Sequence, residues 1–350
     1  MTEIDIALAS DVTGAVYAST VPRACRPKIL SLGGGLDSWA MLLDAELRGE
    51  LPDVVAFVDV GDPEDRQMHP GEWDGTYRHI EEVVRPWCAA RGIEFVEISA
   101  RTGYLIRPEN QAARSLFGWL WTMGQIPVAG PNRICTRIAK VERFERWLDA
   151  TYAGREVECW IGFDAAEQKR VENDPNAGKP RGATGLKARA GSTIAVVLHN
   201  AFRWTKALAH AMTHAGRVNR FPLMERGLCR CRCEALARAS GYPVPRKSAC
   251  QACPYGSRGD WKTLATERPA VFAYAVELER RKPPTAKNGR KLSIMAYDSE
   301  TQTGTPLPVF VSRPYKAKVV PCTVCGAAQR ATKAAGCGYL DDGALEGAAA

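Results

Sequence analysis

Short apolar runs alternate with amphipathic stretches from residue 28 to about residue 170. The apolar runs predict strands at Lys28–Leu32, Val54–Val60, Glu94–Ile98 and Glu156–Ile161. The stretches between and after them have helical periodicity and predict helices at Leu36–Arg48, Gly75–Arg91, Val141–Tyr152 and from Ala165 to Val171. This alternation is typical of an α/β fold, in which helices cover both faces of a doubly wound parallel sheet.

The pattern changes after residue 172. Residues 173–190 are rich in Gly, Pro and basic residues and predict a mobile insertion. Further helices are expected at Asn200–His214, Leu228–Ser240 and Asp260–Arg281, with one strand-like run at Leu307–Ser312 and a disordered Ala/Gly-rich tail. We therefore expect a leader (1–27), a nucleotide-binding α/β domain (28–172), a flexible basic insertion (173–198), a helical region (199–282) and an irregular extension (283–350).

Composition narrows the class of protein. The chain has 350 residues of which 45% are hydrophobic, enough for a substantial core. No apolar run approaches the roughly 20 residues that span a bilayer, and the first residues lack the layout of a signal peptide. We expect a soluble cytoplasmic protein without a membrane partner. In that reducing compartment its 12 cysteines are expected to be metal ligands, catalytic thiols or buried apolar residues rather than disulfides.

Charge is distributed unevenly along the chain. Residues 1–100 carry 8 Lys/Arg and 18 Asp/Glu, whereas the remaining residues carry 39 and 21. The basic second part favours an anionic partner, for which nucleic acid is the obvious candidate. Solvated basic loops would produce the same asymmetry.

A glycine-rich loop follows the first predicted strand. Gly33, Gly34 and Gly35 lack a Cβ that would keep the backbone away from an anion, and the helix after them begins with unpaired N–H groups. Asp37 and Ser38 lie in the first turn of that helix. The spacing fits neither the Walker loop nor the Rossmann fingerprint. A phosphate cradle and an ordinary strand-to-helix turn are both compatible with this loop alone.

Polar groups also follow the second strand. Asp59 and Gly61 are placed at the carboxyl edge of the sheet, where open α/β folds bind ligands. An acid that merely caps the strand end is the alternative.

The cysteines suggest a metal centre. Cys250 and Cys253 have the Cys-x-x-Cys spacing that brings two thiolates onto one metal, and adding Cys135 and Cys233 makes four ligands for a [4Fe–4S] cluster or a zinc ion. A redox pair is the rival interpretation, but the expected βαβ setting is missing. Either Cys229 or Cys231 could replace Cys233. Cys322, Cys325 and Cys337 suggest part of a zinc ribbon, with only three thiols visible.

Together, these motifs resemble the phosphoadenosine phosphosulfate reductase-like family of the PP-loop ATP pyrophosphatases, within the adenine nucleotide alpha-hydrolase superfamily. Residues 33–38 resemble its Ser-Gly-Gly-x-Asp-Ser loop, with Gly33 in place of the first serine. Its further motifs match Asp59-Val-Gly61, Arg133-x-Cys-Thr with Lys140, Ile161-Gly with Glu167 and Arg170, Phe221-Pro-Leu and Lys247-Ser-x-Cys-x-x-Cys-Pro-Tyr255. Val60 replaces a threonine, and Ala166 stands where the family has an aspartate, while Asp164 lies two residues earlier.

The resemblance implies a sheet of about five parallel strands with a cysteine-rich helical region against its ligand edge. It implies binding of ATP or a related adenine nucleotide with Mg²⁺, and cleavage or transfer at the α-phosphate in sulfur transfer or nucleic-acid modification. The implied nucleotide-binding residues are Ser31, Gly33, Gly34, Gly35, Asp37, Ser38, Asp59 and Gly61, and the implied catalytic residues are Asp37, Ser38, Arg133, Lys140 and Arg170. The implied cofactor is a [4Fe–4S] cluster on Cys135, Cys233, Cys250 and Cys253, with zinc as the alternative, and a sulfur donor is a further implied partner.

Two other functions remain open at this point. Reductive cleavage of phosphoadenosine phosphosulfate needs a nucleophilic cysteine near the end of the chain, which Gly336-Cys-Gly338 matches poorly. A non-catalytic nucleic-acid-binding protein stapled by a metal would account for the basic second part. The sequence does not identify the substrate or the oligomeric state.

Overall fold

The computed structural model describes residues 26–107, 112–127, 134–168, 216–246, 248–281, 294, 305–313, 319–331 and 337–338. Several predictions lie outside these residues: the leader up to residue 25, the insertion at 173–198, the helix at 200–214 and the tail beyond residue 338. The candidate residues Arg133 and Arg170 also lie outside them.

A five-stranded parallel sheet forms the centre of the protein. Its strands are β1 (Lys28–Leu32), β2 (Val54–Val58), β3 (Glu94–Ile98), β4 (Glu156–Ile161) and β5 (Gly216–Arg220). They lie in the order β3-β2-β1-β4-β5, and Ile29 of β1 pairs with Val54 on one side and Cys159 on the other. The predicted α/β class and the four predicted strands are confirmed. The edge strand β5 was not predicted, because Gly-Arg-Val-Asn-Arg contains a single apolar residue.

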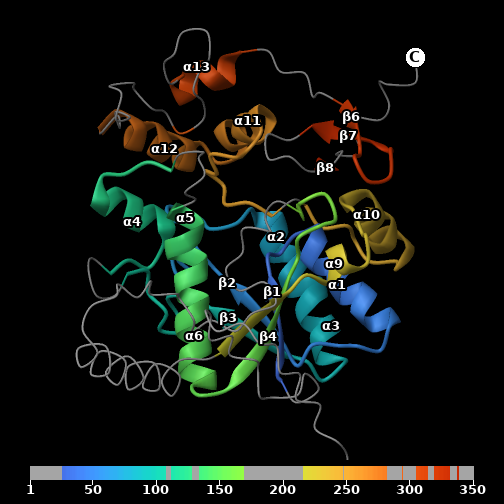
Figure 1. Ribbon diagram of the computed structural model, residues 1–350. Coiled ribbons are helices and arrows are strands. Elements are labelled where there is room, and N and C mark those ends of the chain that lie inside the picture. The colour runs from blue at the N-terminus through green and yellow to red at the C-terminus, as the bar shows by residue number, and fades with distance from the viewer. Residues whose placement is uncertain are drawn as a thin grey trace, which may run out of the picture.

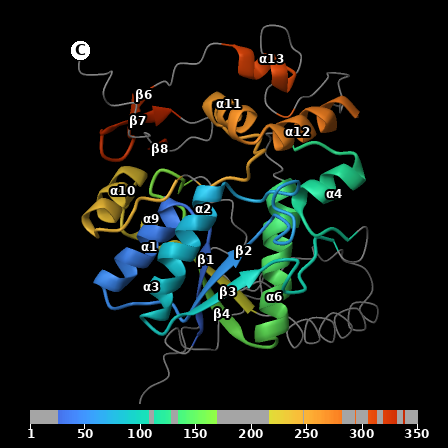
Figure 2. The same cartoon turned by 180° about the vertical axis from the view of Figure 1, so that it is seen from behind.

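Helices cover both faces of the sheet, as Figures 1 and 2 show. One face packs Leu30, Val55 and Phe57 against α1 (Leu36–Leu47) and α3 (Arg85–Ala89). The alternate residues Ile29, Val54 and Ala56 point to the opposite face. That face is covered by α6 (Glu142–Tyr152), which continues a short helix α5 (Ile134–Thr136) and a π-helical segment η3 (Arg137–Val141). The helix predicted from residue 75 to 91 is built from α2 (Asp74–His79), a π-helical segment η2 (Ile80–Val84) and α3.

A third layer lies beyond the carboxyl edge of the sheet (Figure 1). It contains α4 (Leu116–Met123), α11 (Arg258–Glu267), α12 (Pro269–Arg281) and α13 (Leu307–Ser312). These four helices share a second core cluster with Val60, which follows β2, and with Ala252, which lies on the segment before α11. The cysteine-rich helical region therefore packs against the edge at which an open α/β sheet binds its ligands, as predicted.

Two details of this layer differ from the sequence prediction. The helix expected at 260–281 is broken at Arg268, where Pro269 begins a new helix. The run Leu307–Ser312 is a helix rather than a strand: Leu307 and Phe310 are buried and Val309 is exposed, which is helical rather than two-residue spacing.

The remaining elements lie outside the five-stranded sheet. They are α9 (Pro222–Glu225), α10 (Arg230–Ala239) and the small antiparallel strands β6 (Val319–Pro321), β7 (Ala328–Ala331) and β8 (Cys337–Gly338). Helix α10 packs along α1. None of the helices in the described part of the chain has the length and apolar character needed to cross a membrane.

Candidate functional site

The glycine loop lies where the strand order reverses. The chain proceeds from β1 to β2 on one side, whereas β4 lies on the other side of β1, so the carboxyl ends of β1 and β4 border a crevice. Gly33–Gly35 follow β1 and Gly162 follows β4. A methyl group on Gly162 would lie 3.2 Å from the Ser38 nitrogen, so the two strand ends are in contact.

The loop needs its glycines. Gly34 has a φ of +72°, and a methyl group on it would approach Thr76 Cγ2 to 2.6 Å. A methyl group on Gly35 would approach Ser248 Oγ to 2.7 Å. Helix α1 begins immediately afterwards, and no side chain caps its first N–H groups. The loop thus combines close backbone access with the positive end of a helix, which is the arrangement that binds phosphate.

Charged and polar side chains border the loop. Asp37 forms an ion pair with Arg230 of α10, with 2.7 Å between Oδ2 and Nη2. The Ser38 hydroxyl donates to the Gly35 carbonyl at 3.0 Å and fixes the turn. Ser31 lies further back, in β1, where it pairs with Ala56 and Ile161. No motif in the sequence indicates that Arg230 lies beside the glycine loop.

A second carboxylate, Asp164, lies beside Asp37. It follows β4, is 2% exposed and accepts a hydrogen bond from the Ala166 nitrogen at 2.7 Å. Burial, together with the negative charge of Asp37, raises the pKa of Asp164 to about 6. A cation between the two carboxylates would relieve this repulsion, and carboxylate oxygens are the ligands that Mg²⁺ prefers.

Asp59 is fully buried and organises the neighbouring loop. Its Oδ1 accepts hydrogen bonds from the Gly61 nitrogen at 2.9 Å and from the Tyr77 hydroxyl at 2.5 Å, and its Oδ2 lies 2.8 Å from Arg66 Nη2. Arg143, which is also fully buried, donates to the Asp59 carbonyl at 2.6 Å. Both carboxylate oxygens are therefore engaged within the protein, and Asp59 positions the loop around Gly61.

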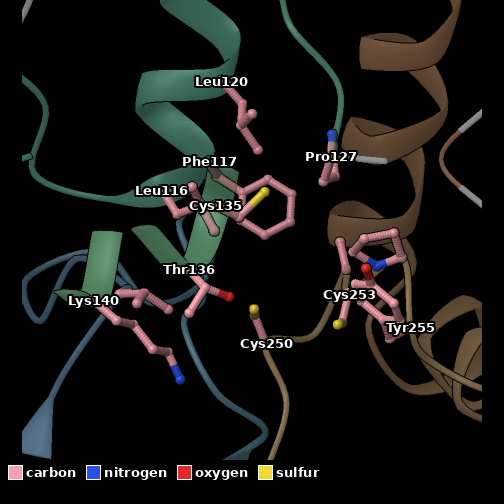
Figure 3. Close-up of a pocket in the computed structure, with 13 residues that line it drawn as sticks. Leu116, Phe117, Leu120, Pro127, Cys135, Thr136, Lys140, Cys250, Cys253 and Tyr255 are labelled. Carbon is pink, nitrogen blue, oxygen red and sulfur yellow. The ribbon is translucent and has the colours of Figure 1, made fainter. Parts of the chain in front are cut away.

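Three of the candidate metal ligands surround one pocket. Figure 3 shows Cys135 facing this pocket from the start of the α5–α6 helix, with Cys250 and Cys253 on the segment that follows α10. The other walls are largely apolar and include Leu116, Phe117, Leu120, Pro127 and Tyr255. Burial, followed by the neighbouring Cys253, raises the pKa of Cys135 to about 11. Without a bound cation this thiol therefore stays protonated at neutral pH, and metal binding would deprotonate it.

Lys140, which lines the pocket and is half-buried, forms an ion pair with a buried carboxylate. Lys140 Nζ lies 2.6 Å from Oε1 of Glu72, whose side chain is fully buried. Burial by itself lowers the pKa of Lys140, but the charge of Glu72 and the thiols of Cys250 and Cys253 outweigh it and raise the pKa. The ammonium therefore stays charged beside the thiols, at the cysteine pocket rather than at the glycine loop.

The two parts of the site are linked by a short segment. Ser248 lies over the glycine loop, and Cys250 follows two residues later, so the two Cα atoms are at most about 7 Å apart. The backbone of Cys250 bridges to that of Glu72, and the Gln251 nitrogen donates to the Gly71 carbonyl at 3.0 Å. A ligand on the loop would therefore lie next to the cysteine pocket.

Cys233 is not part of this pocket. It is fully buried in the core cluster of α1 and α10, and the charges that act on it are those of Asp37, Asp164 and Arg230. The expected set of four ligands is thus divided, because α10 directs Cys233 toward α1. Cys229 and Cys231 do not join the pocket either and instead meet Cys322 and Cys325.

Comparisons with known proteins show likeness to solved structures but not to a known family. No protein-family model matches the chain, and no curated protein matches it. Among solved structures, the chain is similar to the U34-tRNA thiolase NcsA from Methanococcus maripaludis with its [4Fe-4S] cluster, at 16% sequence identity and a TM-score of 0.34 over 72% of each chain.

Proposed function

We propose that this chain is a PP-loop enzyme similar to the phosphoadenosine phosphosulfate reductase-like family, which binds ATP or a related adenine nucleotide and acts at its α-phosphate in sulfur transfer. The observation that carries the proposal is the adjacency of the glycine loop and the three-thiol pocket at one sheet edge, connected by Ser248 and Cys250.

The loop would hold the pyrophosphate part of the nucleotide. The N–H groups of Gly33–Gly35 and Ser38 would donate to its oxygens, and Asp37, with Asp164 beside it, would bind Mg²⁺. Arg230 is held at the loop by Asp37 and supplies a positive charge there, while Asp59 supports the loop that would border the adenosine. Such fixed charges lower the barrier of phosphoryl chemistry.

The reaction that fits this arrangement is adenylation. A carbonyl-type oxygen of the substrate attacks the α-phosphorus, the bond between that phosphorus and the bridging oxygen to the β-phosphate breaks, and pyrophosphate leaves. A sulfur nucleophile then attacks the activated carbon and displaces AMP. Arg133 and Arg170 are proposed to neutralise phosphate charge in this step.

Cys135, Cys250 and Cys253 would hold the iron–sulfur cluster. The sulfur atoms of these three cysteines are spaced more widely than the ligands of a single metal ion. In the described part of the chain, the group whose sulfur atoms all lie within 4.8 Å of one another is a different one, formed by Cys229, Cys231, Cys322 and Cys325. When bound, the cluster supplies a site that carries or activates sulfur. Three protein thiolates would leave one of the four iron atoms without a protein ligand, and Lys140 would supply a positive charge near the thiols.

The acceptor is proposed to be a nucleic acid, because the residues after position 100 carry 39 Lys/Arg and 21 Asp/Glu. The alternative of a non-catalytic nucleic-acid-binding protein predicts no nucleotide turnover. The alternative of sulfonucleotide reduction predicts sulfite from phosphoadenosine phosphosulfate and no release of pyrophosphate.

Asp37→Asn tests the enzymatic proposal. We expect formation of AMP and pyrophosphate from ATP and Mg²⁺, with bulk tRNA or DNA as acceptor, to fall about 100-fold or more, because the variant removes a metal-binding charge. Nucleic-acid binding should be retained. Asp53→Asn is the matched control, since Asp53 lies at the opposite edge of the sheet, where it accepts from the Lys28 nitrogen. Equal turnover in Asp37→Asn and in the wild type would refute the proposal.

Serine variants of the cysteines test the cluster assignment. Cys135→Ser, Cys250→Ser and Cys253→Ser should each lower the iron and acid-labile sulfide of anaerobically purified protein severalfold. Cys233→Ser and Cys88→Ser should retain both, because these thiols are buried in the core cluster around α1. If Cys233→Ser lost iron while Cys88→Ser kept it, Cys233 would be identified as a ligand and the three-thiol assignment would be contradicted.

A further inference from the structure

A second group of cysteines gathers away from the pocket. Cys229 and Cys231 lie at the start of α10, and Cys322 and Cys325 lie in the turn between β6 and β7. Their four sulfur atoms lie within 4.8 Å of one another. Figures 1 and 2 both show the small strands lying beside α10. Two segments far apart in the sequence therefore meet through their thiols.

The local backbone is shaped to present these sulfurs. The Gly326 nitrogen donates to the Cys322 carbonyl at 2.9 Å, and the Cys322 nitrogen donates to the Ala327 carbonyl at 2.7 Å, which closes a tight turn around the Cys-x-x-Cys pair. Gly326 has a φ of +76°, a conformation that favours glycine. On the other segment, the Arg232 N–H donates to the sulfur of Cys229, which also shares hydrogen bonds with the thiols of Cys322 and Cys325.

We propose that Cys229, Cys231, Cys322 and Cys325 form a structural zinc site, distinct from the three-thiol pocket. Zinc with Zn–S bonds of about 2.3 Å places its four sulfurs about 3.8 Å apart. This spacing is compatible with four sulfur atoms that all lie within 4.8 Å of one another. An iron–sulfur cluster inserts several atoms between its ligands and needs a wider spacing. Cys229 and Cys322 are buried, Cys231 is half-buried and Cys325 is exposed, so the site lies at the protein surface and is covered on the side of α10.

The zinc ion would attach the hairpin formed by β6 and β7 to the start of α10, and through Arg230 of α10 to the glycine loop. Arg230 stands between Cys229 and Cys231 and forms the ion pair with Asp37. Fixing the two cysteines therefore also fixes the start of α10, from which Arg230 reaches the loop. The site has a positioning role, and its existence does not depend on the proposed enzymatic function.

Metal analysis of the full chain tests this proposal. Zinc and iron are measured by mass spectrometry in wild-type protein and in the Cys322→Ser/Cys325→Ser and Cys159→Ser variants. We expect about one zinc per wild-type chain, at least a tenfold loss in the double variant and full retention in Cys159→Ser, whose buried thiol belongs to the sheet core. Iron should be unchanged in all three, whereas Cys250→Ser should lose iron and keep zinc.

Cobalt provides a readout that does not depend on a variant folding. Co²⁺ in place of zinc in the wild-type chain should give the visible d–d and thiolate charge-transfer bands of a tetrahedral four-sulfur site. The proposal is overturned if the wild-type chain contains no zinc and gives no such bands, if unreduced protein has a disulfide among these cysteines, or if the double variant loses iron instead of zinc. If the zinc-containing wild-type chain showed no nucleotide turnover, the proposed function would be refuted and the zinc site would stand.

Discussion

Replacing Gly34 by alanine is expected to abolish ATP binding and to lower the free energy of unfolding by about 2–5 kcal/mol. Two costs combine at this position. The left-handed φ of +72° strains any residue with a Cβ, and the added methyl group would lie 2.6 Å from Thr76 Cγ2, so the loop and α2 must move apart. Because the loop N–H groups then leave the phosphate-binding geometry, calorimetric titration with ATP and Mg²⁺ should show no binding.

Gly49→Ala is the matched control for this variant. Gly49 also has a left-handed φ, of +64°, but a methyl group there meets no atom within 4 Å. It should cost about 1–2 kcal/mol and leave ATP binding unchanged. If Gly34→Ala bound ATP as tightly as Gly49→Ala, the loop would not be the phosphate site.

Lys140→Met is expected to destabilise the fold by about 3–5 kcal/mol, because it leaves the charge of a fully buried Glu72 without its partner. Chemical denaturation at pH 7 measures this loss. The double variant Glu72→Gln/Lys140→Met should recover most of the stability, since no buried charge then remains unpaired.

An ion pair with an exposed arginine provides the control for the lysine variant. Arg101, whose side chain is 59% exposed, pairs with Glu97, and Arg101→Met should cost no more than about 1 kcal/mol. Equal losses for Arg101→Met and Lys140→Met would show that the Glu72 pair is not desolvated and that the pocket is open to water.

The sequence was sufficient to predict the central fold because buried parallel strands leave continuous apolar runs. Val54–Val58 is buried at every position, and its apolar run predicts a strand that extends only two residues too far, to Val60. The edge strand β5 leaves no such run, because an edge strand needs few apolar residues. Its buried residues Arg217 and Asn219 are polar, and the Arg217 Nε donates a hydrogen bond to the Asn219 side-chain oxygen at 2.7 Å. Leu307–Ser312 was misassigned because a short apolar run does not distinguish a helix from a strand.

The candidate site was predicted in part. Asp164 follows a strand end, so the rule that selected Asp59 could also have selected it. Ser248 belongs to the motif around Cys250 and Cys253, but its contact with the glycine loop depends on tertiary folding and could not be predicted from the sequence.

The grouping of the cysteines could not be predicted from spacing. Cys229 and Cys233 are one helical turn apart, yet Cys229 faces the C-terminal hairpin and Cys233 faces α1. The packing of α10 against α1 decides that Cys233 is buried in the core while Cys229 lies with Cys322 and Cys325. Nothing in the sequence around Cys322 and Cys325 indicates that their partners lie at the start of α10.

The central claim is that the loop at Gly33–Gly35 binds the pyrophosphate part of an adenine nucleotide. Calorimetric titration of the anaerobically purified full chain with ATP and Mg²⁺ tests it most directly, in the absence and presence of excess pyrophosphate. The account predicts one ATP site per chain that pyrophosphate competes for. Absence of ATP binding, or ATP binding that pyrophosphate does not affect, would contradict it.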